Sequence, residues 1–436
     1  MLGIAFDLGT TSLAAYLCDL NDKCVIKVVS RLNPQIKTGA DVITRITYMA
    51  ESPENRREVC ELLGDAIIDM TGELMKDMEG ASSEGGVSEV TASEDGNWFL
   101  DSIVLVGNPV IMGSVSEYYF GAPLKKYAAS PSDDVYVIGV PMIGGYAGAD
   151  ALAGAFLVNE RRKGKNALLI DIGTNGEIVL LTDDKKIATT AAAGPALEGG
   201  NVECGMRGEE GAVDSVKLSN GLNPTSDILI HVLGSEGGKP EGEKTKDFAK
   251  EKGVCGSGLL SMLECLLKAR VINETGYIQN KGEAMLVGCP PRIASRITET
   301  EKGRAFKLSE SLYIYQDDIR ALQLAISALR TGIEMLIREA ELTVSVIDEI
   351  YLAGAFGNKI SIESALAVGL LPPVNKEKII QAGNLAGEGA CRILTDMDCI
   401  SGVTALKNEI KTISLAEHPD FKDNFMKYMI FDTGSI

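Results

Sequence analysis

The sequence predicts an α/β protein whose chain is built from two related lobes that face each other. The 436-residue length exceeds what one compact core usually needs, so two or more domains are expected. An apolar strand, an Asp-x-Gly-Thr turn and a second apolar strand occur twice, at residues 3–17 and 168–181. A third glycine-rich turn follows a strand at residues 349–352. We expect a first lobe at residues 1–160, with the first hairpin, and a second at 161–436, with the other two turns.

The first hairpin has the composition of a phosphate-binding turn. Asp7 is followed by Gly9, Thr10 and Thr11, and a glycine after the aspartate lets backbone N–H groups point at a phosphate. The threonine hydroxyls add donors, and Asp7 suits Mg²⁺, which prefers one or two carboxylates plus phosphate oxygens. Alone, the motif also fits an ordinary structural hairpin.

The second hairpin repeats this chemistry with Asp171, Gly173, Thr174 and Asn175. Two such turns would grip one polyphosphate from both sides, although a pair of structural hairpins is the alternative. We therefore predict that both hairpins bind phosphate in a cleft between the lobes. Asp7 and Asp171 are the predicted metal ligands and catalytic carboxylates.

The third turn, Ala353-Gly354-Ala355-Phe356-Gly357-Asn358, ends a buried strand. Small residues there allow a flat base or ribose to lie against the backbone, so Gly354, Ala355 and Gly357 are predicted to contact adenosine. A simple strand-to-helix turn is the other interpretation. Taken in chain order, the three turns predict phosphate, phosphate and adenosine contacts to ATP with Mg²⁺.

The other elements follow from hydrophobic periodicity and breaker residues. We expect strands at residues 42–49, 102–106, 135–140 and 349–352. We expect helices at residues 62–78, 147–158, 256–265 and 317–342. Loops are expected at residues 79–96 and 235–253, and a boundary between lobes at residues 160–166.

Composition argues against several classes of protein. No run of about 18 apolar residues exists and the N-terminus has no basic flank, so neither a membrane span nor a signal peptide is expected. The net charge of −19 argues against nucleic-acid binding. Nine cysteines without a C-x-x-C pair indicate reduced thiols in a cytoplasm. His231 and His418 are too few for a histidine metal site or a Ser-His triad.

The order of the three turns resembles the ribonuclease-H-like ATPases of the actin, sugar-kinase and heat-shock superfamily. That resemblance implies two ribonuclease-H-like lobes with a nucleotide cleft between them. Residues 140–156 are similar to the superfamily's first connecting helix, and Asp150 falls where a carboxylate or glutamine positions the attacking water. Asp150 could equally cap a helix.

A closer resemblance, to the ATPase domain of the reductive activators of corrinoid proteins, covers almost the whole chain. It is carried by the segments 33–35, 39–46, 106–108, 168–180, 192–199, 205–207, 255–259, 318–320 and 352–358. The resemblance implies an Mg-ATP-dependent ATPase that drives an electron from an iron–sulfur centre to Co(II) corrinoid in a methyltransferase partner. A cytoplasmic homodimer with no nucleic-acid or membrane partner is expected.

Two departures from that family stand out. No ferredoxin cysteine spacing is present, so we expect no iron–sulfur cluster in this chain and an electron donor on another domain or protein. After Gly107 and Asn108, the segment 109–114 replaces the small polar residue and paired histidines that relatives tend to carry.

Several interpretations stay open. The small-residue stretch 189–205 could be a binding surface or a close-packed loop, and Cys255 a reactive thiolate or a residue that fits a tight turn. A small-metabolite kinase is one alternative function, and a dehydratase activator, whose two subunits would share a cluster through Cys255, is another. A kinase could bind its substrate through Asn33, Gln35, Asp41 and Arg45.

Overall fold

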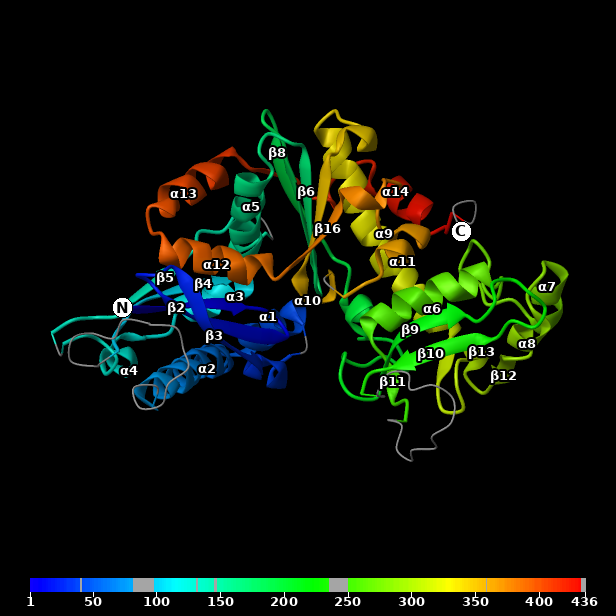
Figure 1. Cartoon of the computed structure of the whole chain (residues 1–436), viewed down its shortest axis with the longest axis horizontal. Helices are drawn as coiled ribbons and strands as arrows, with labels where there is room; N and C mark the ends of the chain where they lie inside the picture. The colour runs from blue at the N-terminus through cyan, green and yellow to red at the C-terminus, as the bar shows by residue number, and fades with distance from the viewer. Residues whose placement is uncertain are drawn as a thin grey trace. The chain divides into compact units, whose positions relative to one another are not determined.

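The computed structural model describes residues 1–39, 41–80, 98–130, 132–144, 147–234, 250–357 and 359–432 (Figure 1). The chain forms two compact units. Unit 1 comprises Met1–Leu169, Val179–Thr189 and Asn384–Ile413, and unit 2 comprises Ile170–Ile178, Thr190–Gly383 and Ser414–Ile436. The lobe boundary expected at residue 160 stays a prediction.

Unit 1 is organised around a five-stranded sheet with the order β3-β2-β1-β4-β5. The strands are β1 (Leu2–Leu8), β2 (Ser12–Asp19), β3 (Cys24–Leu32), β4 (Leu100–Gly107) and β5 (Tyr136–Gly139). The first three form an antiparallel meander, and β4 runs parallel to β1 and β5. The carboxyl ends of β1 and β4 therefore meet at one edge of the sheet, where the first hairpin lies.

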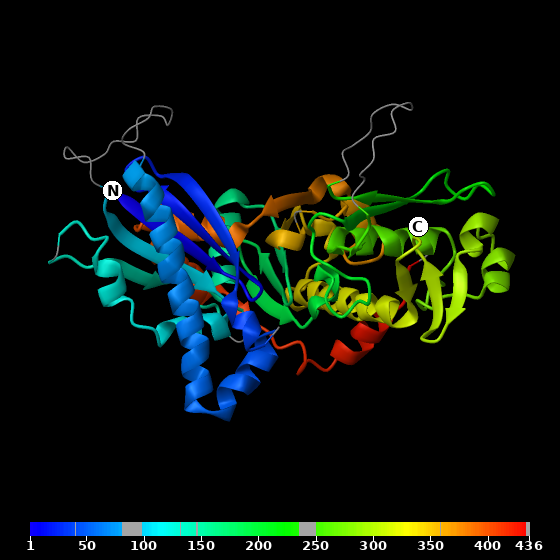
Figure 2. The same cartoon turned by 90° about the horizontal axis from the view of Figure 1, so that it is seen from below.

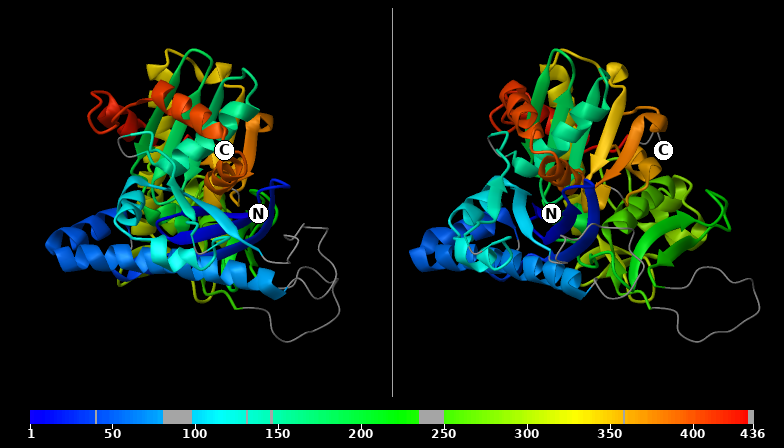
Figure 3. Two further views of the ribbon diagram at one scale, coloured as in Figure 1. Left: turned by 90° about the vertical axis from the view of Figure 1, so that its left-hand side faces the viewer. Right: turned by 60° about the vertical axis from the view of Figure 1, so that its left-hand side comes forward.

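Helices cover both faces of this sheet, which explains why its central strands are apolar throughout. The long helix α2 (Pro53–Gly80) lies on one face, and α5 (Ala149–Arg161) and α12 (Leu385–Thr395) lie on the other (Figures 1 and 2). Figure 3 shows α2 from two further sides. The sequence predictions of a helix at 62–78, a helix at 147–158 and strands at 102–106 and 135–140 are confirmed.

The strand expected at residues 42–49 is wrong, because this segment forms α1 (Val42–Glu51). Its β-branched residues suggested a strand. However, the Asp41 side chain accepts a hydrogen bond from the Thr44 N–H at 2.8 Å and starts a helix with a capping box. The remaining elements of unit 1 are η1 (Pro34–Lys37), α3 (Pro109–Ser116), α4 (Gly121–Lys125), α13 (Cys399–Glu409) and β17 (Lys411–Thr412).

A second large sheet has the order β16-β15-β6-β7-β8-β17. It consists of β6 (Ala167–Ile172), β7 (Gly176–Leu181), β8 (Lys186–Ala191), β15 (Glu349–Ala353) and β16 (Ile379–Gly383), with β17 added at one edge. Without β17, the sheet repeats the third-second-first-fourth-fifth order of the first sheet. This repeat confirms the duplication that the two hairpins predicted.

Unit 2 contains the longest buried helix, α9 (Gln316–Glu339), among the described residues. Its apolar face is the predicted one, with Ile319, Leu322, Ile326, Leu329 and Ile333 buried. The helix predicted at 256–265 is α6 (Gly256–Lys268). Further elements are η2 (Pro195–Glu198), β9 (Ala212–Leu218), β10 (Ile228–Val232), β11 (Gly253–Val254), α7 (Lys281–Leu286), α8 (Pro291–Ala294), β12 (Ile297–Thr300), β13 (Gly303–Lys307), β14 (Tyr313–Tyr315), η3 (Val344–Val346), α10 (Gly354–Gly357), α11 (Ile362–Ala367), η4 (Lys376–Lys378) and α14 (Phe421–Tyr428).

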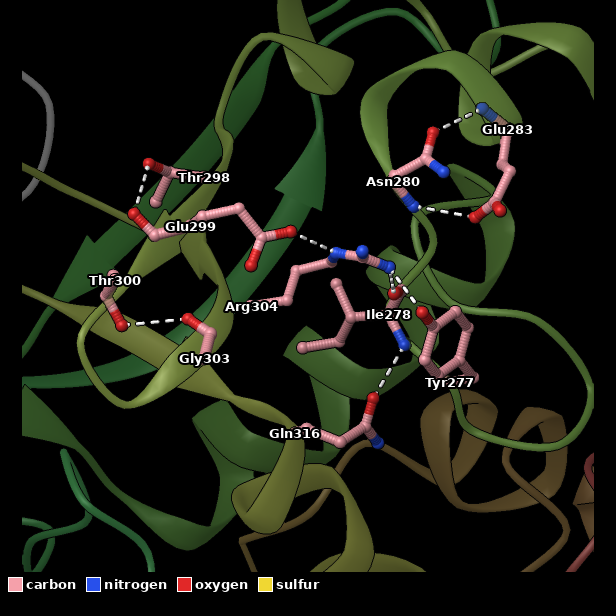
Figure 4. A network of polar contacts seen from close by, with 10 residues as sticks. All are labelled: Tyr277, Ile278, Asn280, Glu283, Thr298, Glu299, Thr300, Gly303, Arg304 and Gln316. Atoms are coloured by element: carbon pink, nitrogen blue, oxygen red, sulfur yellow. Dashed lines mark hydrogen bonds and ion pairs between the residues drawn. The ribbon is translucent and has the colours of Figure 1, made fainter.

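A polar network fastens the segment between α6 and α7 to the β12–β13 hairpin (Figure 4). The Arg304 guanidinium donates to the Tyr277 hydroxyl at 2.6 Å, to the Ile278 carbonyl at 3.0 Å and to the Glu299 carboxylate at 2.7 Å. The Gln316 side chain accepts a hydrogen bond from the Ile278 N–H at 2.9 Å. These bonds satisfy the backbone of a segment that has no regular structure.

Two sequence predictions are outside the reach of the structure. Most of the loops expected at 79–96 and 235–253 lies outside the described residues.

Within the described residues, no helix has both the length and the apolar character needed to cross a membrane.

Candidate nucleotide-binding residues

Asp7 lies near the end of β1 and is held by a residue from the far end of the sequence. Its carboxylate accepts a hydrogen bond from the Asn384 side-chain amide at 2.6 Å. Asn384 also donates to the Tyr16 hydroxyl at 3.1 Å and accepts from the Gly387 N–H at 2.9 Å, which caps α12. Burial raises the pKa of Asp7 to about 6, and the bond from Asn384 opposes that rise.

Asp150 lies in the first turn of α5, whose N-cap residue is Gly148. Its carboxylate accepts a hydrogen bond from the Ala151 N–H at 2.8 Å. The pKa of Asp150 is raised to about 7, mainly by burial and to a lesser extent by the negative charge of Asp7, while the hydrogen bond from Ala151 opposes the rise. The charge of Asp7 thus acts on Asp150, and Asp150 is not the cap residue of its helix.

Close backbone approach places these two carboxylates at one edge of the sheet. A Cβ atom added to Gly148 would lie 2.5 Å from the Gly107 carbonyl oxygen and 2.6 Å from the Asn108 Cα. Asn108 in turn donates to the Thr10 hydroxyl at 3.0 Å. Only glycine at position 148 lets the start of α5 pack against the end of β4 in this way.

The backbone of the first hairpin is held from behind by buried side chains. The Asn33 amide donates to the Gly9 carbonyl at 2.9 Å, and the Arg45 guanidinium donates to the Thr10 carbonyl at 2.5 Å. In a trans peptide the N–H points opposite to the C=O, so the N–H groups of Thr10 and Thr11 face away from these partners. Neither N–H has an acceptor among the described residues. Two outward N–H groups suit an anion.

The same contacts occupy three of the four residues that a kinase could have used to bind its substrate. Asn33 and Gln35 are fully buried and Arg45 is 1% exposed. Arg45 also donates to the Gly39 carbonyl at 2.9 Å and to the Gln35 side chain at 3.2 Å. Asp41 caps α1. The side chains of Asn33, Gln35 and Arg45 therefore support the protein's own backbone and are not available to a substrate, whereas the Asp41 carboxylate is partly exposed.

The second hairpin connects β6 and β7 in the same form as the first. The Gly173 N–H donates to the Asn175 carbonyl at 3.0 Å, which closes the turn. The Thr174 hydroxyl donates to the Glu198 carboxylate at 3.0 Å. Burial raises the pKa of Glu198, while this hydrogen bond and the positive charge of Arg207 lower it.

The third turn lies directly against Asp171. Gly354 has a left-handed φ of 85°, and a Cβ atom added there would lie 2.5 Å from Asp171 Oδ1 and 2.9 Å from the Ile172 carbonyl oxygen. Position 354 therefore requires glycine on two grounds. Ala355 and Gly357 belong to the short helix α10, and Asn358 lies outside the described residues.

A cavity of about 670 Å³ lies in unit 2 beside the segment that follows α10. Its walls come from β9, α6 and α11, together with Lys359 and Ile360. Hydroxyl, ammonium and carboxylate groups line it: Ser257, Ser261, Ser361, Ser364, Lys217, Lys268, Lys359, Asp214, Glu264 and Glu363. Glu264 is fixed by an ion pair with Lys268 at 2.6 Å and by a hydrogen bond from the Ser364 hydroxyl.

Packing bears on the two alternatives left open for the stretch 189–205 and for Cys255. Within 189–205, a Cβ atom on Gly200 would lie 2.6 Å from the Pro195 ring, and one on Gly205 would overlap the Gly199 carbonyl, so this part is a close-packed loop. Cys255 is the buried N-cap residue of α6, and its Sγ lies 3.3 Å from the Ser257 hydroxyl. In the described part of the chain, no three Cys, His, Asp or Glu residues are grouped as a metal cluster would need.

Sequence reasoning missed two residues of these sites, Asn384 and Glu198. An asparagine directly before a helical pattern was a signal for a cap, but nothing in the sequence linked it to Asp7. Glu198 was visible only as a single acid in a segment of alanines and glycines. The catalytic roles of Asp7, Asp150 and Asp171, and the nucleotide contacts of the hairpin residues, stay predictions.

Comparisons with known proteins give a consistent result over the whole chain. Two family models match, the RACo middle region over residues 2–162 and the C-terminal domain of RACo, the ASKHA domain, over residues 165–435. The corrinoid activation enzyme RamQ of Eubacterium limosum is 32% identical over 98% of this chain and 70% of its own length. The Co(II) methylated amine-specific corrinoid protein reductase of Methanosarcina barkeri is 24% identical over 94% of this chain and 73% of its own.

A solved structure, of a reductive activator for corrinoid, iron-sulfur protein, matches with a TM-score of 0.75 and 26% identity. The match covers 99% of this chain and 66% of that one, so this chain spans about two thirds of the solved protein. Together with the ASKHA model, it confirms the predicted actin, sugar-kinase and heat-shock ATPase fold.

Proposed function

This chain belongs to the RACo family of reductive activators of corrinoid proteins, and on that premise we propose that it is an Mg-ATP-dependent ATPase. Hydrolysis would drive reduction of a Co(II) corrinoid in a methyltransferase partner protein. Two relatives whose names state corrinoid activation or corrinoid-protein reduction support this assignment. The observation that carries the ATPase part is the first hairpin, which directs two free N–H groups outward beside a pair of carboxylates.

We assign the phosphates of ATP to the two hairpins. The N–H groups of Thr10 and Thr11 are directed outward because the carbonyls behind them are held by Asn33 and Arg45. Gly9 completes the first turn, and Gly173, Thr174 and Asn175 form its counterpart in unit 2. Backbone N–H groups are the donors that turns of this kind offer to phosphate.

We assign Mg²⁺ to the carboxylates of the hairpins. Asp7 and Asp150 fit this role, because two nearby buried carboxyl groups with raised pKa values gain from a cation that offsets their charges. Asp171 is the predicted ligand of the second hairpin. When bound, Mg²⁺ would neutralise the charge of the phosphates. Asp150, in the first turn of α5, is also our candidate for the residue that holds the attacking water.

We assign the adenosine end to unit 2. The turn with Gly354, Ala355 and Gly357 leads into Lys359 and Ile360, which line the 670 Å³ cavity. Cavities of several hundred Å³ suit small ligands and cofactors. Glu264, fixed by Lys268 and Ser364, offers acceptors to ribose hydroxyls.

ATP would act on the partner because the nucleotide-bound chain has different affinities for two states of the partner. A nucleotide shifts a partner's state only when the complex binds one state better than the other. The electron itself would come from an iron–sulfur donor on another domain or protein, because this sequence has no ferredoxin cysteine spacing. A cytoplasmic homodimer without nucleic-acid or membrane partners completes the proposal.

The test combines binding with cobalt spectroscopy. The full chain, a cognate corrinoid protein and a low-potential chemical reductant are mixed anaerobically, and Co(II) is followed by absorbance. We expect Co(I) to accumulate only with Mg-ATP, and the Asp7→Ala and Asp171→Ala variants to lose at least about a hundredfold in rate, as removal of a phosphoryl-transfer group does. The exposed carboxylate variant Asp22→Ala is the control. Wild-type rates in both hairpin variants would refute the proposal.

A further inference from the structure

The carboxylate of Glu198 lies over the second hairpin and has no task in the function proposed above. Its Oε2 accepts the hydrogen bond from the Thr174 hydroxyl at 3.0 Å. A Cβ atom added to Gly173 would lie 3.7 Å from Glu198 Oε1. Both oxygens of the carboxylate are therefore next to the residues that are expected to contact phosphate.

The backbone around Glu198 fixes the carboxylate in this place. Glu198 ends η2, and Gly194 and Gly199 on either side have left-handed φ values of 72° and 88°. A Cβ atom added to Gly199 would lie 2.7 Å from the Met206 carbonyl oxygen. Neighbouring Leu197 is fully buried. A segment packed this tightly leaves the side chain little freedom to move away from the hairpin.

The cost of burial argues that this carboxylate has a use. Glu198 is partly exposed, yet the burial of its carboxyl group raises its pKa, and such a group is costly unless hydrogen bonds or charges compensate it. The compensation that the structure gives comes from the Thr174 hydroxyl and, more weakly, from the charge of Arg207. The Thr174 contact links the carboxylate directly to the hairpin.

The hydrogen bond decides what the Thr174 hydroxyl can offer a ligand. A hydroxyl has one hydrogen to donate and two lone pairs to accept with. When the hydrogen is donated to Glu198, only the lone pairs remain for a ligand. Phosphate oxygens are acceptors as well, so they gain nothing from this oxygen, whereas a cation or a cation-bound water does.

We propose that Glu198 is a positioning residue that fixes the Thr174 hydroxyl as an acceptor for Mg²⁺, or for water bound to it, beside the second hairpin. This inference rests on the proposed binding of Mg-ATP. It gives Thr174 a different task from the Thr10 and Thr11 backbone, which offers donors to phosphate. Glu198 itself acts through Thr174 and has no contact with the reacting atoms.

The test separates metal-dependent from metal-free nucleotide binding in the full chain. Calorimetry with a non-hydrolysable ATP analogue is run without Mg²⁺ and over a Mg²⁺ titration. We expect Glu198→Ala and Thr174→Val each to raise the Mg²⁺ concentration needed for tight binding about tenfold, the size of one lost hydrogen bond. The double variant should lose no more than either single variant, because both remove the same interaction. Metal-free binding should stay close to that of the wild type in Glu198→Ala, and also in Thr174→Val, because that substitution keeps the backbone N–H groups that are proposed to contact phosphate.

Two further variants control for folding and for charge. Glu198→Gln keeps an oxygen that can accept from Thr174. It should therefore need nearly the same Mg²⁺ concentration for tight binding as the wild type, and it keeps the test possible if Glu198→Ala does not fold. Glu203→Ala removes an exposed acid from the same segment and should change neither measurement. Weaker metal-free binding in Thr174→Val would overturn the inference, because the hydroxyl would then donate to phosphate. A wild-type chain that binds no ATP would instead refute the proposed function.

Discussion

The two Asp-x-Gly-Thr hairpins have the same motif and strand order but are braced by opposite chemistry. Donors, the Asn33 amide and the Arg45 guanidinium, hold the carbonyls of the first hairpin. An acceptor, the Glu198 carboxylate, holds the Thr174 hydroxyl of the second. The first hairpin is therefore left with N–H donors that face away from these partners, and the Thr174 hydroxyl of the second is left with lone pairs that can accept. The comparison teaches that a duplicated motif specifies position, while the residues behind it decide which ligand atoms it suits.

Removing the brace of the first hairpin should have the largest effect on this contrast. Arg45→Met keeps the volume of the side chain but loses its bonds to the carbonyls of Thr10 and Gly39. Leaving buried acceptors without partners costs about 1–3 kcal/mol each, so we expect the free energy of unfolding to fall by about 3 kcal/mol. Binding of ATP should weaken by more than about tenfold, because the Thr11 N–H would no longer be held outward.

Urea unfolding and calorimetry measure the two effects, and Arg57→Met provides the control. Arg57 is an exposed arginine on α2, so its loss should change neither quantity. An Arg45→Met variant with the stability and ATP affinity of the wild type would contradict the role of the brace.

A substitution at Gly354, which packs against Asp171 beside the second hairpin, should have the next largest effect. Gly354→Ala places a Cβ in a left-handed conformation and within 2.5 Å of Asp171 Oδ1. Left-handed strain costs roughly 1–2 kcal/mol and the overlap adds to it, so we expect about 2 kcal/mol of destabilisation together with weaker nucleotide binding.

Gly369→Ala is the matched control for strain. Gly369 also lies in unit 2 and has a φ of 78°, but a Cβ atom there would meet nothing within 4 Å. The difference between the two variants, in thermal unfolding and in ATP affinity, measures the contact with Asp171 alone. Equal losses in both would show that the third turn does not depend on that contact.

The sequence predicted the duplicated frame well and its supports poorly. The hairpins, the strands on either side of them and α9 follow from local periodicity, which one segment carries by itself. The Asn384–Asp7 bond joins residues 377 positions apart, and no local pattern encodes such a pairing. Segment 42–49 was predicted wrongly for a different reason: its β-branched residues suggested a strand, whereas the Asp41 capping box starts a helix. The burial of the polar Arg45 in that helix did not follow from the apolar pattern either.

The carboxylate pair differs from Glu198 in the charges around it: the negative charge of Asp7 raises the pKa of Asp150, whereas the Thr174 hydroxyl and the charge of Arg207 lower the pKa of Glu198 in part. Burial and the charge of Asp7 raise the pKa of Asp150 to about 7, whereas an aspartate in an unfolded chain titrates near 4. The folded state thus favours the protonated form. The stability that this raised pKa contributes is fully present below about pH 4 and is lost as the pH rises through about 7.

Asp150→Asn removes that charge and keeps an oxygen that can accept from the Ala151 N–H. At pH 8 the variant should be more stable than the wild type, by at most the roughly 4 kcal/mol that a shift of three pKa units represents, while near pH 4 the two should unfold together. The exposed control Asp22→Asn should show no such divergence. At the same time Asp150→Asn should bind Mg²⁺ more weakly, since the repulsion that destabilises the free protein is what a cation relieves. A variant less stable than the wild type at pH 8 would mean that the Asp150 carboxylate is stabilised in the free protein, and that Asp7 and Asp150 are not a repelling pair.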